Sequence, residues 1–330
     1  PMLVSLMQFV TDLTPPPQLV AVWAEERGFA GLYVPEKTHV PISRSTPWPG
    51  GELPDWYRRC YDPVVALAAA AAVTTRLRVG TGACLVAVHD PILLAKQIAS
   101  LCAMSGERFV LGVGFGWNVE ELADHGVPFA DRIAVTVDKL AAMRALWAAE
   151  PVHYEGTHAS VPPSWAWPKP AVAPPVLFGC RPSARAFEVI ARHGDGWQPI
   201  EGYGELLGAL PMLHAAFERA GRDPATAQVC VYSSAGDPAT LHEYRRAGVA
   251  EVALALPSAG RPRLRTRSRR PRRSPAAAAP WRRNAGTGPT CSCPAARQAR
   301  RWTAPRAPSP RRYPSRRAGS APGFGGRRRR

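Results

Sequence analysis

The sequence predicts a closed (β/α)8 barrel followed by a basic tail that does not belong to that fold. Through residues 1–260, short apolar runs alternate with amphipathic or alanine-rich segments, which is typical of βα units around a parallel sheet. After Gly260 the composition changes abruptly to Arg, Pro, Ala, Gly and Ser. We therefore expect a barrel domain at 1–260 and a disordered low-complexity tail at 261–330.

Strands and helices alternate in the order that a barrel requires. Eight runs have the length and composition of buried strands: Leu3–Val10, Gly31–Glu36, Leu77–Ala87, Arg108–Gly116, Pro175–Cys180, Gly194–Ile200, Gln228–Ser234 and Glu251–Pro257. Seven helices are expected between them, at 16–28, 62–75, 91–105, 131–149, 182–193, 204–220 and 237–247. This count fits a closed barrel better than an open doubly wound sheet. The tail begins where an eighth helix is due, so we expect that helix to be lost.

Two long connections interrupt the alternation. Residues 38–60 are rich in Pro, Trp and Gly, and residues 151–174 place Tyr154, Trp165 and Trp167 among prolines. Long loops in compact domains are usually functional. We expect both connections to lie over the C-terminal ends of the strands as lids or substrate walls.

The formal charge of +17 comes from the tail. Residues 261–330 hold 22 Arg and no Lys, Asp or Glu, whereas residues 1–260 hold 20 basic and 25 acidic side chains, a net charge of about −5. Such a tail cannot bury enough apolar area to offset its ordering entropy. It is either the out-of-frame translation of a GC-rich gene, which could leave an inactive product, or a polycationic arm that binds nucleic acid without sequence specificity.

Composition also bounds the compartment and the chemistry. The seven Cys include no CxxC pair, and His153 and His158 have no metal-site spacing, so we expect reduced thiols and no metal. The N-terminal residues lack a basic n-region, and no apolar stretch is long enough to span a bilayer. We expect a cytoplasmic protein with no membrane association. A GxSxG nucleophile elbow is missing from the sequence, which disfavours a hydrolase.

Glycines alternate at the end of the fourth expected strand, in Gly112–Asn118. They allow a ligand to approach the backbone, and free N–H groups at the following helix start favour an anion such as a cofactor phosphate. The candidate cofactor residues are Gly114, Phe115, Gly116, Trp117 and Asn118. The spacing matches neither a dinucleotide fingerprint nor a P-loop, and a plain tight turn is the alternative.

Two other strand ends carry candidate site residues. Gly82, Ala83 and Cys84 are small enough to leave room for a flat ring, although glycine in a strand often marks only a bulge. Lys37 and His39 follow the second strand, at the barrel end where catalytic groups gather, and either could transfer protons. Solvated loop charges are the alternative for this pair.

A fourth candidate segment ends the fifth expected strand and enters a helix. It contains Gly179, Cys180, Arg181 and Ser183. Amide groups at the helix start, together with the Arg181 guanidinium, could bind a phosphate. An ordinary surface arginine is the alternative.

Several segments, taken in order, resemble one known family. They are Tyr33–Pro41, Thr46–Gly51, Asp90–Gln97, Met104–Trp117 and His193–Trp197. Through most of residues 1–260 the chain is similar to the luciferase-like monooxygenase superfamily, and within it to the actinobacterial branch that uses the deazaflavin coenzyme F420. Several motifs in the correct order are a far stronger signal than any one of them.

The resemblance implies a flavin-like ring in the barrel mouth, often against a non-proline cis peptide, which would lie around Gly82 to Cys84. It places the cofactor phosphate on Gly114–Asn118 and near Gly179–Ser183. Hydride would pass between F420 and a small organic substrate; the alternative is an FMN-dependent monooxygenase. Trp48, Trp117 and Trp165 would shape a pocket for an apolar or aromatic substrate. Family members are commonly dimers, so a homodimer is possible.

This chain departs from the family pattern at Lys37, at Cys102, which replaces a commonly acidic residue, and at the lost eighth helix. The family usually has Pro-Glu-His-Thr-His after the second strand, and Lys37 stands at the first of these His positions. The resemblance therefore implies that His39 transfers the proton, or that Lys37 binds an anionic ring. Loss of the eighth helix would expose an apolar face of the barrel.

Overall fold

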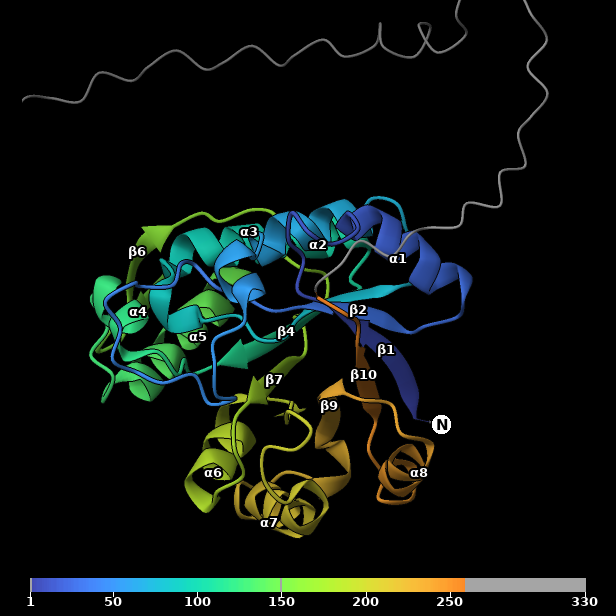
Figure 1. Cartoon of the computed structure of the whole chain (residues 1–330). Coiled ribbons are helices and arrows are strands. Elements are labelled where there is room, and N and C mark those ends of the chain that lie inside the picture. The colour runs from blue at the N-terminus through green and yellow to red at the C-terminus, as the bar shows by residue number, and fades with distance from the viewer. Residues whose placement is uncertain (1, 149, 259–330) are drawn as a thin grey trace, which may run out of the picture. The chain divides into compact units, whose positions relative to one another are not determined.

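A computed structural model describes residues 2–148 and 150–258 and confirms the barrel (Figure 1). Eight parallel strands close in the order β1-β10-β9-β8-β7-β4-β3-β2. Their bounds are β1 Leu3–Met7, β2 Gly31–Val34, β3 Arg78–Thr81, β4 Phe109–Gly114, β7 Val176–Gly179, β8 Gly196–Trp197, β9 Gln228–Ser234 and β10 Glu251–Ala255. Pairing of β1 with β10, from Leu3 with Glu251 to Met7 with Ala255, closes the ring.

Helices fill each connection between consecutive barrel strands. They are α1 Pro17–Glu26, α2 Pro63–Ala71, α3 Pro91–Ser105, α4 Val119–Asp124, α5 Arg132–Ala148, α6 Ala184–His193, α7 Leu206–Arg219 and α8 Pro238–Arg246. Figure 1 shows α1 to α3 on one side of the barrel and α6 to α8 on the other. Helices from the N-terminal half of the sequence thus cover one side of the barrel, and helices from the C-terminal half cover the other side.

Local sequence explains where several of these helices begin. Asp62, Asp90 and Asp237 each precede a proline, and each carboxylate accepts a hydrogen bond from a backbone N–H three residues later. An aspartate cap satisfies a free donor of the first turn, and proline at the next position needs no N–H partner there. Asp-Pro at these points therefore fixes the start of α2, α3 and α8.

A polar network fills part of the barrel interior. The buried carboxylate of Glu251 accepts hydrogen bonds from the Ser5 hydroxyl, the Tyr33 hydroxyl and the Arg78 guanidinium. Burial raises the pKa of the Tyr33 phenol well above its usual value, so this hydroxyl stays a donor. The buried Glu251 carboxylate is thus paired with the Arg78 guanidinium, which offsets the cost of burying its charge.

Most expected strands extend a few residues beyond the observed ones, and two of them were much too long. The third strand ends at Thr81 and not at Ala87: Gly82–Ala83 is a cis peptide, and Val86–Val88 form a short 3-10 helix. The cis bond lies where the family resemblance placed it. The sixth expected strand is only two residues long, because Pro199 has no N–H to donate to the ladder.

Residues 152–164 form a hairpin, whereas the expectation for residues 151–174 is a lid or substrate wall over the C-terminal ends of the strands. Strands β5 Val152–Glu155 and β6 Ser160–Ser164 pair antiparallel. The Tyr154 hydroxyl donates a 2.6 Å hydrogen bond to Asp138 of α5, which holds the hairpin against the outside of that helix.

The predicted tail at 261–330, including the loss of an eighth helix, lies outside the described residues. Within the described ranges, none of the helices combines the length and the apolar character that crossing a bilayer requires.

Candidate functional site

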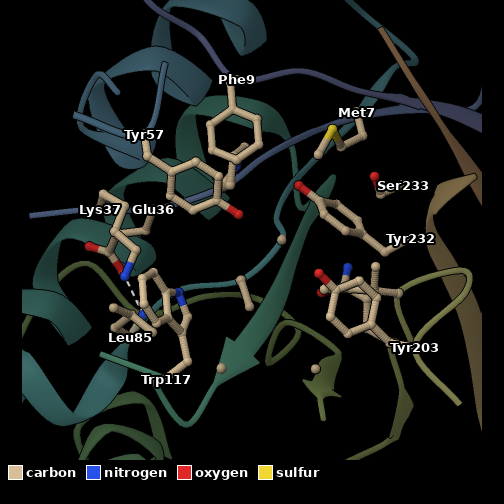
Figure 2. Close-up of a pocket in the computed structure, with 18 of the residues that line it drawn as sticks. Met7, Phe9, Glu36, Lys37, Tyr57, Leu85, Trp117, Tyr203, Tyr232 and Ser233 are labelled. Atoms are coloured by element: carbon tan, nitrogen blue, oxygen red, sulfur yellow. Dashed lines mark hydrogen bonds between the residues drawn. The ribbon is translucent and has the colours of Figure 1, made fainter. Parts of the chain in front are cut away.

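A cavity of about 980 Å³ opens at the C-terminal ends of the barrel strands. Residues at or after all eight strand ends contribute to its walls. Figure 2 shows the rings of Phe9, Tyr57, Trp117, Tyr203 and Tyr232 around the space, with Glu36 and Lys37 at one side and Tyr232 and Ser233 at the other. This is the barrel end at which active sites of this architecture form.

The structure brings all four predicted segments to this cavity. The predicted site residues in its walls are Lys37, Gly82, Ala83, Gly114, Phe115, Gly116, Trp117, Gly179, Cys180 and Arg181. They come from the ends of β2, β3, β4 and β7, which are consecutive neighbours in the barrel. One continuous wall therefore carries ten of the fourteen site residues that the sequence singled out.

Four predicted residues lie elsewhere in the described structure, outside the cavity walls. Cys84 is fully buried behind the wall, and the Asn118 and Ser183 side chains accept hydrogen bonds from backbone N–H groups at the starts of α4 and α6. His39 is 41 % exposed, with its Nε2 2.9 Å from Asp124. Their roles in binding or catalysis stay predictions.

The expectation that Trp165 shapes the pocket is wrong. Trp165 is 84 % exposed and lies on the hairpin side of α5. The reason is the direction in which the chain runs. Residues 151–174 follow helix α5 and lead into the N-terminal end of β7, whereas the cavity lies at the C-terminal ends of the strands. Trp48 and Trp117, which follow β2 and β4, do line the cavity.

Lys37 forms a buried ion pair with Glu121 of α4. Only 5 % of the lysine side chain and 1 % of the glutamate side chain are exposed, and the Lys37 ammonium lies 4.9 Å from the centroid of the Trp117 ring. The Asn118 side chain caps α4 by accepting from the Glu121 N–H. The helix cap thus positions the carboxylate that holds the lysine in the cavity wall.

Glu36, the residue before Lys37, forms a second buried pair. Its Oε2 accepts a 2.5 Å hydrogen bond from the Leu85 N–H, and its Oε1 lies 2.6 Å from Nε2 of His89. Burial would raise the pKa of Glu36, but the hydrogen bonds from His89 and Leu85 lower it below its usual value. Glu36 is therefore an ionised carboxylate facing the cavity.

Glu36, Cys84 and His89 also have the residue types of a metal site, with their ligand atoms within 4.8 Å of one another. Both oxygens of Glu36 already accept hydrogen bonds, and burial raises the pKa of the Cys84 thiol well above its usual value. We assign the trio as a hydrogen-bonded cluster.

Aromatic side chains form the wall opposite the glycines. Trp48, Trp56 and Tyr57 come from residues 38–60, and Tyr57 contacts Phe9 at a ring-centroid distance of 4.8 Å and Trp48 at 5.4 Å. Burial raises the pKa of the Tyr57 phenol to about 12. This connection is therefore a cavity wall, as expected, and the Tyr57 hydroxyl in it is neutral.

Cationic and unpartnered polar groups in the walls fit an anionic aromatic cofactor. The guanidinium of Arg132 stacks on Phe129, that of Arg181 lies 5.4 Å from the Tyr203 ring centroid, and all four residues line the cavity. Arg132 Nε and the Tyr232 hydroxyl are buried atoms without a hydrogen-bond partner. Such atoms are costly unless a ligand or water satisfies them.

Sequence reasoning missed half of the cavity wall. Many of the missed residues lie at the ends of the other four barrel strands. They are Met7 and Phe9 at β1, Gln198 and Ile200 after β8, Tyr232 and Ser233 in β9, and Ala255 to Ser258 at β10. The signal that could have found them is positional. Once eight strands are assigned, every residue just past a strand is a candidate for the mouth of the barrel.

Comparisons with known proteins agree with this geometry. The family model of the luciferase-like monooxygenases matches residues 18–290. An uncharacterized protein of Mycobacterium tuberculosis is 41 % identical over 259 residues, which cover 77 % of this chain and 91 % of the relative. The F420-dependent glucose-6-phosphate dehydrogenase of Beutenbergia cavernae is 31 % identical, over 62 % of this chain and 58 % of its own length.

A solved structure has the same fold. The F420-dependent secondary alcohol dehydrogenase, in complex with an F420-acetone adduct, superposes with a TM-score of 0.61 over 77 % of this chain and 93 % of its own, at 16 % identity. The family match covers most of the chain and runs past the boundary expected at residue 260. The chain therefore belongs to the luciferase-like monooxygenase family.

Proposed function

We propose that this protein binds coenzyme F420 in the barrel mouth and transfers a hydride between it and a small apolar or aromatic organic substrate. The observation that carries the proposal is that segments ending four neighbouring strands line one aromatic-walled cavity. Named relatives that depend on F420 support the choice of cofactor. A volume of about 980 Å³ is at the upper end of the range of small-molecule sites.

The cofactor, when bound, supplies the carbon-bound hydride, and the protein supplies placement and electrostatics. Gly82, Ala83 and Gly114 present backbone without bulky side chains, so a flat ring can lie against them. Trp117 and Tyr57 offer aromatic surface for a ring or for an apolar substrate. The connection at 38–60 excludes water from the mouth.

Lys37 is the residue that we propose next to the reacting ring. Its ammonium, held by Glu121 against Trp117, stabilises the negative charge that a hydride adds. This assigns the lysine the role of an electrostatic partner in place of the usual histidine. His39, bound to Asp124 at the surface, has no contact with this wall among the described residues.

Arg132 and Arg181 are the proposed partners of the cofactor phosphate. Both are cavity residues, and the Nε–H group of Arg132 is a hydrogen-bond donor without a partner in the structure. Arginine binds phosphate through paired N–H groups, which a lysine cannot reproduce. Arg181→Ala should therefore weaken the binding of a phosphorylated cofactor more than that of a free ring system.

A titration decides the proposal. Purified protein is titrated with F420 and, separately, with FMN, while cofactor fluorescence is recorded; the two are then put in competition. We expect saturable 1:1 binding of F420 that FMN displaces only at higher concentration, and weaker binding in the Lys37→Met variant. Preference for FMN would move the assignment to a flavin monooxygenase, and binding of neither would end it.

A further inference from the structure

A second cavity lies behind the wall that Glu36 contributes to the cofactor cavity. It has a volume of about 380 Å³. Its polar lining residues are His89, Asp90, His125, Lys139, His158 and Ser160. They come from the loop after β3, from the end of α4, from α5 and from the tip of the β5–β6 hairpin. Three imidazoles and few apolar groups suit it to hold water.

One hydrogen bond crosses the wall between the two cavities. Glu36 lines the cofactor cavity and His89 lines the second cavity. Their side chains are 3 % and 23 % exposed, and Nε2 of His89 lies 2.6 Å from Oε1 of Glu36. A proton on His89 therefore needs to move less than the length of one hydrogen bond to reach a carboxylate in the cofactor cavity.

Hydride transfer creates a need for such a connection. A substrate that accepts a hydride must also gain one proton, and in the reverse reaction it must lose one. Cofactor and substrate would fill the mouth of the barrel, and the Lys37–Glu121 pair is almost completely buried. A path that does not pass through the mouth could then exchange protons with solvent.

We infer that Glu36 and His89 form a proton-transfer dyad that connects the cofactor cavity with the second cavity. This inference rests on the proposed function. In the reductive direction the Nε2 proton of the imidazolium moves to Oε1 of Glu36, which leaves a neutral imidazole and a carboxylic acid. The acid gives this proton to the group in the cofactor cavity that hydride transfer has left negatively charged, which restores the Glu36 carboxylate. A proton from bulk solvent, which enters through water in the second cavity, then protonates His89 again.

The electrostatics of the pair set where its proton rests. Burial alone would lower the pKa of His89, but the hydrogen bond and the charge of Glu36 raise it above its usual value. The other titratable groups that act on this pair are Asp62, Cys84, His125 and Lys139. Both shifts favour the imidazolium–carboxylate form of the pair, in which the mobile proton lies on His89, on the side of the second cavity.

The first test follows the reduction potential of the bound cofactor against pH by spectroelectrochemical titration. A dyad that gives its proton to the group receiving the hydride couples reduction to its own titration, so the slope should change where His89 titrates. We expect this change in the wild-type protein and in His158→Gln, a control from the same cavity. It should disappear in His89→Gln and in Glu36→Gln. An unchanged profile in both variants would overturn the dyad.

The second test needs no cofactor. In protein labelled with ¹⁵N-histidine, NMR should show that His89 titrates above pH 6.5 and that Glu36→Gln lowers its midpoint by about one pH unit or more, a tenfold change in proton affinity. A His89 midpoint that Glu36→Gln leaves unchanged would reject the coupling. Lack of cofactor binding by the wild-type protein would instead reject the proposed function, and the dyad's role with it.

Discussion

Two connections of similar composition take opposite places in this barrel. Residues 38–60 and 151–174 are both long and rich in Pro and Trp. The first follows β2 and supplies Trp48, Trp56 and Tyr57 to the cofactor cavity, whereas the second follows α5 and exposes Trp165 on the outside. The direction of the chain on entering a connection, and not its composition, decides whether its aromatic residues reach the mouth.

The comparison extends to the wall on which the first connection begins. Glu36 and Lys37 lie between the end of β2 and residues 38–60, and each is held by a partner of opposite charge. The hairpin, by contrast, is held by a hydrogen bond from Tyr154 to Asp138 on the outer side of α5. Loss of a partner should therefore cost more free energy at the wall than at the hairpin.

The largest effect is expected for His89→Ala. Removing one partner of a buried ion pair leaves a charge without compensation, so the free energy of unfolding should fall by about 3 kcal/mol. Urea unfolding measured at several pH values tests this expectation.

The pH dependence of that loss follows from the two pKa shifts. The pKa of His89 is raised above 6.5, so its contribution is complete below pH 6.5 and is lost as the pH rises through the folded value. The pKa of Glu36 is lowered from 4.5, so its contribution is present above that pH. The difference between wild type and His89→Ala should therefore be greatest between pH 4.5 and 6.5. A larger difference at pH 9 would contradict the assigned pair.

The next effect compares the two connections directly. Tyr57→Ala removes a ring that contacts Phe9 and Trp48 in the cavity wall, and cofactor affinity should fall about tenfold, which corresponds to roughly 1.4 kcal/mol. Trp165→Ala is the matched control, because it removes an aromatic ring from the exposed hairpin. Equal losses of affinity in the two variants, measured by fluorescence titration, would break the comparison.

The smallest effect concerns the hairpin alone. Tyr154→Phe removes the hydroxyl that donates to Asp138 and should lower the free energy of unfolding by about 1 kcal/mol, the usual net contribution of such a hydrogen bond. Cofactor affinity should stay as in the wild type. A loss of affinity would show that the hairpin contributes to the mouth after all.

The barrel could be predicted from the sequence because the signals of its strands and helices are local. Each apolar run and each Asp-Pro helix start depends only on neighbouring residues. It also located the wall formed by β2, β3, β4 and β7, since glycines and charges mark those strand ends. It could not locate Glu121 or His89 as partners of Lys37 and Glu36, because these pairs join residues 84 and 53 positions apart. The position of Trp165 was predicted wrongly because the composition of residues 151–174 does not show which end of the barrel they lie at.

The central claim is that the segments at 36–37, 82–83, 114–117 and 179–181 surround one cofactor ring. A crystal structure of the protein soaked with F420 tests this claim most directly. We predict ring density inside the cavity, between Gly82–Ala83 and the Trp117 side chain, with the phosphate near Arg132 or Arg181. Density at another surface, with the cavity filled only by water, would contradict the account.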